Sequence, residues 1–159
     1  MGITPDSLPR LRTKGQTRSM ASPSLTLQPS VDDYVGAFDS INVTAKQRAM
    51  LEFHHAAPGR AVSATTLASA VGFSNYTSAN LQYGKLAGHV AGALGLVVPE
   101  HVLVGVLVTF VYPDQAKNEQ FLWVMRERVA LALEELGWVP KVSQYLYPDL
   151  AMKALAEDG

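Results

Sequence analysis

The chain has 159 residues, a formal net charge of −1 at pH 7, 48% hydrophobic residues and no cysteine. This length is enough for one domain with its own core, and the lack of cysteine excludes a disulfide framework and a cysteine-ligated zinc site. The near-zero net charge excludes a strongly basic nucleic-acid-binding protein, so only part of the surface is available for contact with DNA.

Residues 1–30 are rich in proline, serine, threonine and arginine, and they carry four basic residues and one acid. We predict a flexible basic N-terminal tail, which is either a disordered extension or an arm that contacts phosphates or the minor groove. The tail lacks the apolar stretch of a signal peptide, and no run in the chain is long enough to span a bilayer. We therefore expect no membrane partner and a cytoplasmic, nucleoid-associated protein.

Residues 31–159 are predicted to form one domain of the α+β class. We expect it to be mainly helical, with a helix-turn-helix-like core and a small β-hairpin or sheet. The first two helices are expected over residues 31–40 and 45–57. The second follows the N-cap residue Thr44 and stops before Pro58.

His54 and His55, near the end of the second predicted helix, suggest a metal site or acid–base chemistry. Neighbouring side chains point about 100° apart around a helix, so these two rings cannot easily hold one ion. No third ligand has suitable spacing. We therefore predict no metal, no cofactor and no catalytic residue, and we expect this helix end to lie near the DNA or in the core.

The segment 62–95 is predicted to form the helix-turn-helix. A short helix over residues 64–71 ends at Gly72, where a left-handed backbone conformation favours glycine. A turn over residues 73–76 then precedes a longer helix that begins near Thr77. The inward face of this longer helix is expected to consist of apolar residues at helical spacing: Ala79, Tyr83, Leu86, Val90 and Leu94.

Another face of the longer helix carries hydrogen-bond donors and acceptors, namely Ser78, Gln82, Lys85 and His89. In helix-turn-helix proteins the start of the second helix enters the major groove and reads base edges. From Phe73 to Pro99 the chain has one base and no acid, so nothing in this stretch repels phosphate. Glycines recur every four residues along the same helix, and we expect another helix of the domain to approach them closely: Gly84, Gly88 and Gly92.

Residues 102–112 are rich in β-branched and aromatic residues, which predicts a buried strand. After a loop over residues 113–119, residues 120–125 form either the return strand of a hairpin or the first turns of a helix. The rest is expected to form a helix over residues 126–136 that ends at Gly137, a strand or extended arm over 138–147, and a short helix over 150–155. This is the order of a winged-helix domain, with a hairpin that serves more to close the core than as a wing.

The stretch from Gly72 to Leu86, GFSNYTSANLQYGKL, resembles the modified-cytosine sensor domain at the N-terminus of McrA-type restriction endonucleases, a bacterial family. The segment from Trp123 to Trp138 is similar to the same proteins. The resemblance implies binding of double-stranded DNA that contains 5-methylcytosine, with the methyl group sensed by a small apolar and aromatic pocket. The nucleases of this family carry a C-terminal HNH domain, but all four histidines of this chain precede its expected position, so we expect no nuclease activity.

Carried over to this sequence, the resemblance implies a methyl pocket at Phe73, Tyr76 and Thr77. It implies DNA contacts from the turn and the following helix: Ser74, Asn75, Tyr76, Thr77, Ser78, Asn80, Gln82 and Lys85. Arg48 lies in the first two turns of the second predicted helix and is a further candidate for phosphate contact, or else a solvated surface charge.

Structural interpretations stay open for several of these residues. Asn75 either holds a left-handed turn or caps the helix, Phe73 staples the helix entry, and Tyr83 packs in the core. At the level of function, the alternative is a sequence-specific regulator that reads unmodified DNA with the same helix-turn-helix. An enzyme or a protein-interaction adaptor is the third hypothesis.

Overall fold

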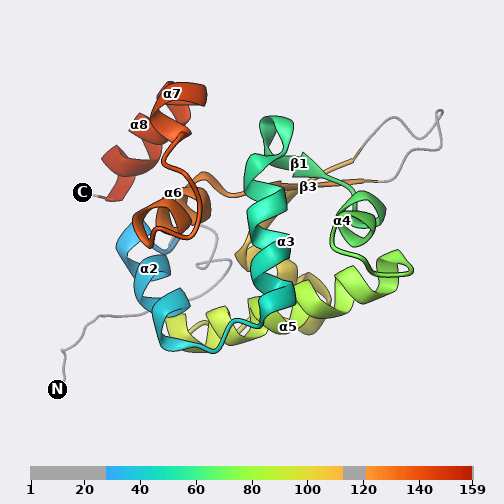
Figure 1. Ribbon diagram of the computed structural model, residues 1–159. Helices are drawn as coiled ribbons and strands as arrows, with labels where there is room; N and C mark the ends of the chain where they lie inside the picture. The colour runs from blue at the N-terminus through green and yellow to red at the C-terminus, as the bar shows by residue number, and fades with distance from the viewer. Residues whose placement is uncertain (1–27, 113–120, 159) are drawn as a thin grey trace, which may run out of the picture.

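The computed structural model describes residues 28–112 and 121–158. Residues 1–27 of the predicted N-terminal tail lie outside this range. Figure 1 shows a mainly helical molecule with a small antiparallel sheet, which confirms the predicted α+β class. The elements are α2 (Val31–Ser40), α3 (Ala45–Ala56), η1 (Pro58–Arg60), β1 (Ala61–Val62), α4 (Ala64–Ala70), α5 (Tyr76–Leu94), η2 (Glu100–Val106), β2 (Val108–Val111), β3 (Leu122–Met125), α6 (Glu127–Glu135), α7 (Ser143–Leu146) and α8 (Pro148–Asp158).

Side-chain caps fix where the first helices begin. Ser30 and Asp33 form a reciprocal capping box at the start of α2. Thr44 and Gln47 do the same at the start of α3, which confirms Thr44 as its N-cap. Each box satisfies backbone N–H groups that have no partner within the helix. The other end of the Gln47 amide reaches α5, so this cap also joins two helices.

The predicted helix-turn-helix is present as α4, a short turn and α5. Gly72 has a φ of 88°, and the following N–H, that of Phe73, donates to the Ala68 carbonyl at 2.9 Å, so the turn closes as expected for glycine at a helix end. On α5 the inward residues Ala79, Tyr83, Leu86 and Val90 are fully buried, and Leu94 is partly buried. The hydrophobic spacing therefore predicted the phase of this helix correctly.

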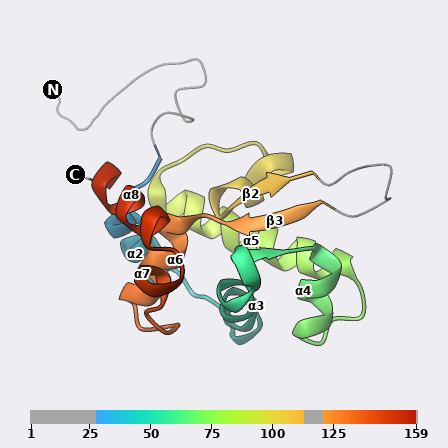
Figure 2. The same cartoon turned by 90° about the horizontal axis from the view of Figure 1, so that it is seen from above.

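The sheet has the order β1-β3-β2, and all neighbouring strands are antiparallel. Trp123 of β3 pairs with Val62 on one side and with Phe110 on the other. Figure 2 shows β2 and β3 side by side, and their connection through residues 113–120 lies outside the described chain. The return-strand interpretation of residues 120–125 is confirmed. The predicted order of a helix, a helix-turn-helix and a hairpin is present as α3, α4 with α5, and β2 with β3, although the short β1 was not expected.

The predicted strand over residues 102–112 is mostly wrong, and one of the two alternatives for residues 138–147 is not formed. Residues 100–106 form the 3-10 helix η2, and only Val108–Val111 are in a strand. The reason is that β3 has only four residues and ends at Met125, which pairs with Val108. The residues before Val108 therefore have no residue of β3 to pair with. Of the two alternatives for residues 138–147, the strand is not formed: residues 138–142 lie in neither a helix nor a strand, and α7 begins at Ser143. The final helix α8 is longer than predicted.

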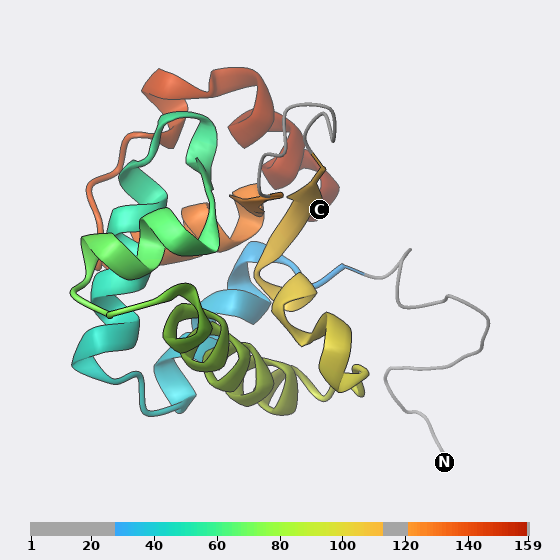
Figure 3. The same cartoon turned by 90° about the vertical axis from the view of Figure 1, so that its right-hand side faces the viewer.

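In the view of Figure 1, α5 runs along the base of the molecule, with α2, α6 and α8 at one end and α4 and the sheet toward the other. Figure 3 shows η2 beside α5. A Cβ added at Gly88 would lie 3.2 Å from Leu103 of η2, whereas one at Gly84 or Gly92 would meet no atom of the described residues within 4 Å. The expected close approach to the glycines therefore occurs at one position only, and η2 makes it.

Candidate nucleic-acid interface

The first turns of α5 present a polar, solvent-exposed face. Tyr76 is 52% exposed, and Leu81, which the sequence did not single out, is 55% exposed. The other exposed candidates in this region are Ser74, Asn75, Thr77, Asn80 and Lys85. The fold therefore leaves the start of the second helix of the helix-turn-helix free to meet a ligand.

Asn75 is the N-cap of α5. Its backbone is extended, with φ of −157° and ψ of 169°, and its side-chain oxygen accepts from the N–H groups of Thr77 at 3.0 Å and Ser78 at 3.4 Å. This decides between the two structural alternatives in favour of the cap. The side-chain oxygen of Asn75 is thus already used within the protein.

Phe73, Tyr76 and Thr77 lie close together at the entry to α5, but their environments differ. Phe73 is partly buried and packs against the core, with the Lys46 ammonium 5.3 Å from the centre of its ring. Lys46 also donates to the Val71 carbonyl, so this base of α3 lies beside the turn. Tyr76 and Thr77 are exposed. The methyl pocket at these residues stays a prediction, since they line none of the cavities described below.

Two of the proposed contacts point partly into the molecule. Ser78 is half-buried, and Gln82 is half-buried with its side-chain oxygen 3.4 Å from the Gln47 amide nitrogen. Beyond Gln82 an open groove of about 840 Å³ continues between α5 and the connection from α2 to α3. Lys85 and His89 line this groove, so the polar face extends along the helix.

Arg48 does not join the residues of the α5 face. Its guanidinium stacks on the Trp138 ring at 4.2 Å, and its Nε lies 3.5 Å from Glu52 without a hydrogen bond. Two residues along a helix correspond to about 200° of rotation, so Arg48 and Lys46 face different neighbours. Lys46 is therefore the base of α3 that the structure brings to the helix-turn-helix turn.

The histidine pair divides between two buried networks. His54 lies between the Tyr83 hydroxyl and the Trp123 carbonyl, with 2.9 Å to each. Because a carbonyl only accepts, Nε2 of His54 carries the proton and Nδ1 accepts from Tyr83. Burial lowers the pKa of His54 to about 4, so the ring is neutral near pH 7. This supports the interpretation that the helix ends in the core.

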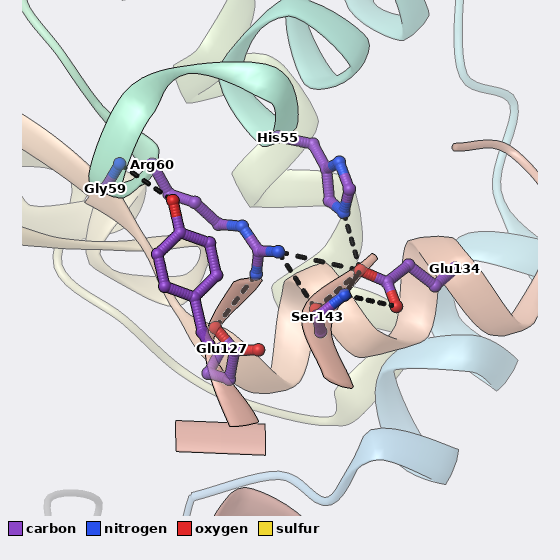
Figure 4. A network of polar contacts seen from close by, with 7 residues as sticks. His55, Gly59, Arg60, Glu127, Glu134 and Ser143 are labelled. Atoms are coloured by element: carbon purple, nitrogen blue, oxygen red, sulfur yellow. Dashed lines mark hydrogen bonds and ion pairs between the residues drawn. The ribbon is translucent and has the colours of Figure 1, made fainter. Parts of the chain in front are cut away.

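His55 belongs to a polar cluster that the sequence analysis missed, called here the Arg60 cluster: His55, Arg60, Glu127, Glu134, Ser143 and Tyr147. Figure 4 shows this network and labels every member except Tyr147. Arg60 is 2% exposed and has a φ of 57°, which is rare for a residue other than glycine. Its guanidinium donates to Glu127 at 2.8 Å and to Ser143 at 2.9 Å, and the Tyr147 ring stacks on it at 4.7 Å.

Glu134 is the acceptor at the centre of this cluster. One of its oxygens lies 2.8 Å from His55 Nε2 and accepts from the Ser143 hydroxyl at 2.5 Å. The serine is fully buried and its proton is committed to Glu134, so the trio does not present a nucleophile to a substrate. The cluster instead fastens α7 to the end of α3 and to α6, and hence fixes the C-terminal helices.

Among residues 28–112 and 121–158, no group of three or more acidic or histidine side chains is placed to hold a metal ion. No helix within these residues is long and apolar enough to cross a membrane. Comparison of the whole chain with family models, curated proteins and solved structures gives no match. The assignment of function therefore depends on the geometry of α5 and on the sequence resemblance.

Proposed function

We propose that this protein binds double-stranded DNA that contains 5-methylcytosine, with the first turns of α5 in the major groove, and that it does not cleave the DNA. The observation that carries the proposal is the exposed face of α5, on which Tyr76, Asn80 and Lys85 stand free of the core. An α-helix fits the major groove, and hydrogen-bonding side chains on its first turns can reach base edges.

Charge supports the same face. No acidic residue occurs between Glu52 and Glu100, so α4, the turn and α5 bring no carboxylate of their own toward phosphates. Lys46 and Lys85 are the bases on or beside this region. With so few phosphate contacts, the non-specific affinity is weak, and selective binding requires readout of the bases.

The methyl group supplies that readout in the proposal. The methyl on C5 of cytosine projects into the major groove as the thymine methyl does, and it requires apolar surface. Tyr76, Thr77 and Leu81 offer exposed apolar atoms on the first turns of α5. Burial of one methyl contributes about 0.8 kcal/mol, which corresponds to a several-fold preference for the modified duplex.

The direct test is fluorescence anisotropy of one duplex in fully methylated, hemimethylated and unmodified forms at a fixed salt concentration. We expect several-fold tighter binding to methylated DNA. Equal affinity for all forms would favour the regulator of unmodified DNA, and no binding to any form would refute the proposal. Incubation of methylated plasmid with Mg²⁺ or Mn²⁺ should leave the plasmid intact, and reproducible cleavage would overturn the absence of nuclease activity.

Tyr76→Ala should reduce the preference for methylated DNA to near unity without unfolding the protein, because Tyr76 is half-exposed and outside the core. The ratio of the two Kd values measures this effect. Tyr145→Ala is the matched control, since Tyr145 is a 74% exposed tyrosine on α7, away from the proposed interface. If Tyr76→Ala keeps the full preference, the methyl group is sensed elsewhere.

Lys85→Ala should weaken binding to methylated and unmodified DNA alike, because a phosphate contact carries no sequence information. The slope of log K against log salt concentration should become less steep by about one. Lys141→Ala, at an exposed lysine between α6 and α7, should leave the slope unchanged. A change confined to one of the two duplexes would contradict a phosphate contact for Lys85.

A further inference from the structure

A second feature, separate from the exposed face of α5, is a cavity of about 380 Å³ near the C-terminal end of that helix. Its walls come from the connection after α5, from η2 and from the first strand of the hairpin. Most of the lining side chains are apolar, including Leu96, Val97, Val98, Val102, Val106 and Phe110. This volume lies in the range of small-molecule sites, which are apolar with a few fixed polar groups.

Arg126 supplies the fixed charge. Its Nε donates to the Gly105 carbonyl at 2.8 Å, and both residues line the cavity, so the guanidinium is held at the cavity wall. The Tyr34 hydroxyl, also at the wall, donates to the Val106 carbonyl at 2.7 Å and stays neutral, since burial raises its pKa to about 12. Within residues 28–112 and 121–158, no carboxylate lies at ion-pair distance from Arg126.

Two of the valines that line the cavity are exposed to solvent. Val97 is completely exposed and Val102 is 39% exposed, and both line the opening. An apolar ligand body would remove these side chains from water, which is favourable in proportion to the area covered. Within the described part of the chain the two Nη groups of Arg126 make no hydrogen bond, so they can hold an anion in a bidentate hydrogen bond, the arrangement that guanidinium forms with carboxylates.

We propose that this cavity binds a small organic anion, a carboxylate on an apolar body, with the carboxylate on Arg126 and the body against the valines and Phe110. The apolar wall, with Arg126 as its one charged side chain and no acidic partner for it within residues 28–112 and 121–158, is complementary to an amphipathic monoanion. A metal ion would find no cluster of ligands in the described part of the chain, and a neutral lipid would leave the guanidinium unpaired. The proposal does not depend on DNA binding.

The test is isothermal titration calorimetry of the full chain at pH 7 with octanoate and, as the uncharged match of equal chain length, 1-octanol. We expect saturable binding of one octanoate per chain, with octanol bound about tenfold more weakly or worse, as a charged hydrogen bond would give. Equal affinities for the acid and the alcohol, or no octanoate binding at millimolar concentration, would overturn the proposal.

Two variants locate the site. Arg126→Gln should weaken octanoate binding about tenfold or more and leave octanol binding unchanged. Val97→Asp should also weaken octanoate binding by charge repulsion, and because Val97 is fully exposed this change does not disturb the core. Leu155→Asp is the matched control, since Leu155 is an exposed residue on α8 that does not line the cavity. Unchanged octanoate binding in Arg126→Gln and Val97→Asp would refute the assignment, and since no DNA is present that result leaves the DNA proposal intact.

Discussion

Glu134→Gln should lower the free energy of unfolding by about 3–5 kcal/mol, the range for breaking a buried ion pair by removal of one partner. The carboxylate is 7% exposed and accepts from Ser143 and His55, with the Arg60 guanidinium 3.6 Å away. An amide has the same shape but no charge, and its NH₂ group would face donors. Arg60 would then stay buried with Glu127 as its one remaining carboxylate within ion-pair distance in the described chain. Urea denaturation followed by circular dichroism measures the change.

Glu52→Gln is the control for this experiment, since Glu52 makes an exposed i,i+4 ion pair with Arg48. Such surface pairs contribute about 0–1 kcal/mol, so this variant should unfold close to the wild-type midpoint. A loss of similar size in both variants would mean that Glu134 has no special part in stability. Protease susceptibility of residues after Val142 should rise in Glu134→Gln, because the cluster fastens α7 and α8 to the rest of the domain.

The protein should lose stability as the pH falls from about 6.5 to about 4, because of His54. Its pKa is lowered in the folded state to about 4, so the unfolded chain takes up the proton first. A histidine whose pKa is lowered by folding contributes its full stabilisation at pH values above its pKa in the unfolded chain. This contribution is lost as the pH falls to the pKa of the folded state. One unit of pKa shift corresponds to 1.36 kcal/mol, so the free energy of unfolding should fall by about 3 kcal/mol over this pH range.

Two neighbouring groups modify this pH dependence. Burial also lowers the pKa of His55, which adds to the loss on acidification, despite its hydrogen bond to Glu134. Burial raises the pKa of Glu127, so that carboxyl takes up a proton more readily in the folded state and offsets part of the loss. The net result is still a decrease, since two histidines act against one carboxyl.

Urea denaturation at a series of pH values between 7 and 4 checks this prediction. His54→Gln should be less stable at pH 7 but should show a flatter dependence on pH, because the titrating ring is gone. His89→Gln, at an exposed histidine of α5, should keep the wild-type dependence. Stability that is constant across this pH range in the wild type would be inconsistent with a neutral, buried His54.

Features with a local cause could be read from the sequence. Thr44 caps α3 by forming reciprocal hydrogen bonds with Gln47, three positions along the chain. Gly72 follows the end of α4 because glycine readily adopts a positive φ. Burial of Tyr83 followed from helical spacing alone. The exposed face at the start of α5 also followed from helical spacing, except at Ser78 and Gln82, which are half-buried, and Gln82 contacts Gln47 on another helix.

Features that depend on distant partners could not be read in this way. The extent of β2 is set by the four residues of β3, and nothing in residues 102–112 records that limit. Arg48 has an ordinary surface position on α3, yet Trp138 covers it from the far end of α6. Arg60 and Glu127 are 67 residues apart, and the sequence around either residue does not indicate that the two side chains form a buried ion pair.

The position of β3 has a consequence for synthesis of the chain on the ribosome. β1 and β2 each pair with β3 and with no other described strand, so β1 waits for about 60 further residues before it can pair. At roughly 5–20 residues per second this interval lasts roughly 3–12 seconds. During it the nascent polypeptide holds α3, α4 and α5 without a sheet and Arg60 without its carboxylates. The rate of translation over residues 63–134 therefore determines how long the incompletely folded nascent chain is accessible to chaperones and proteases.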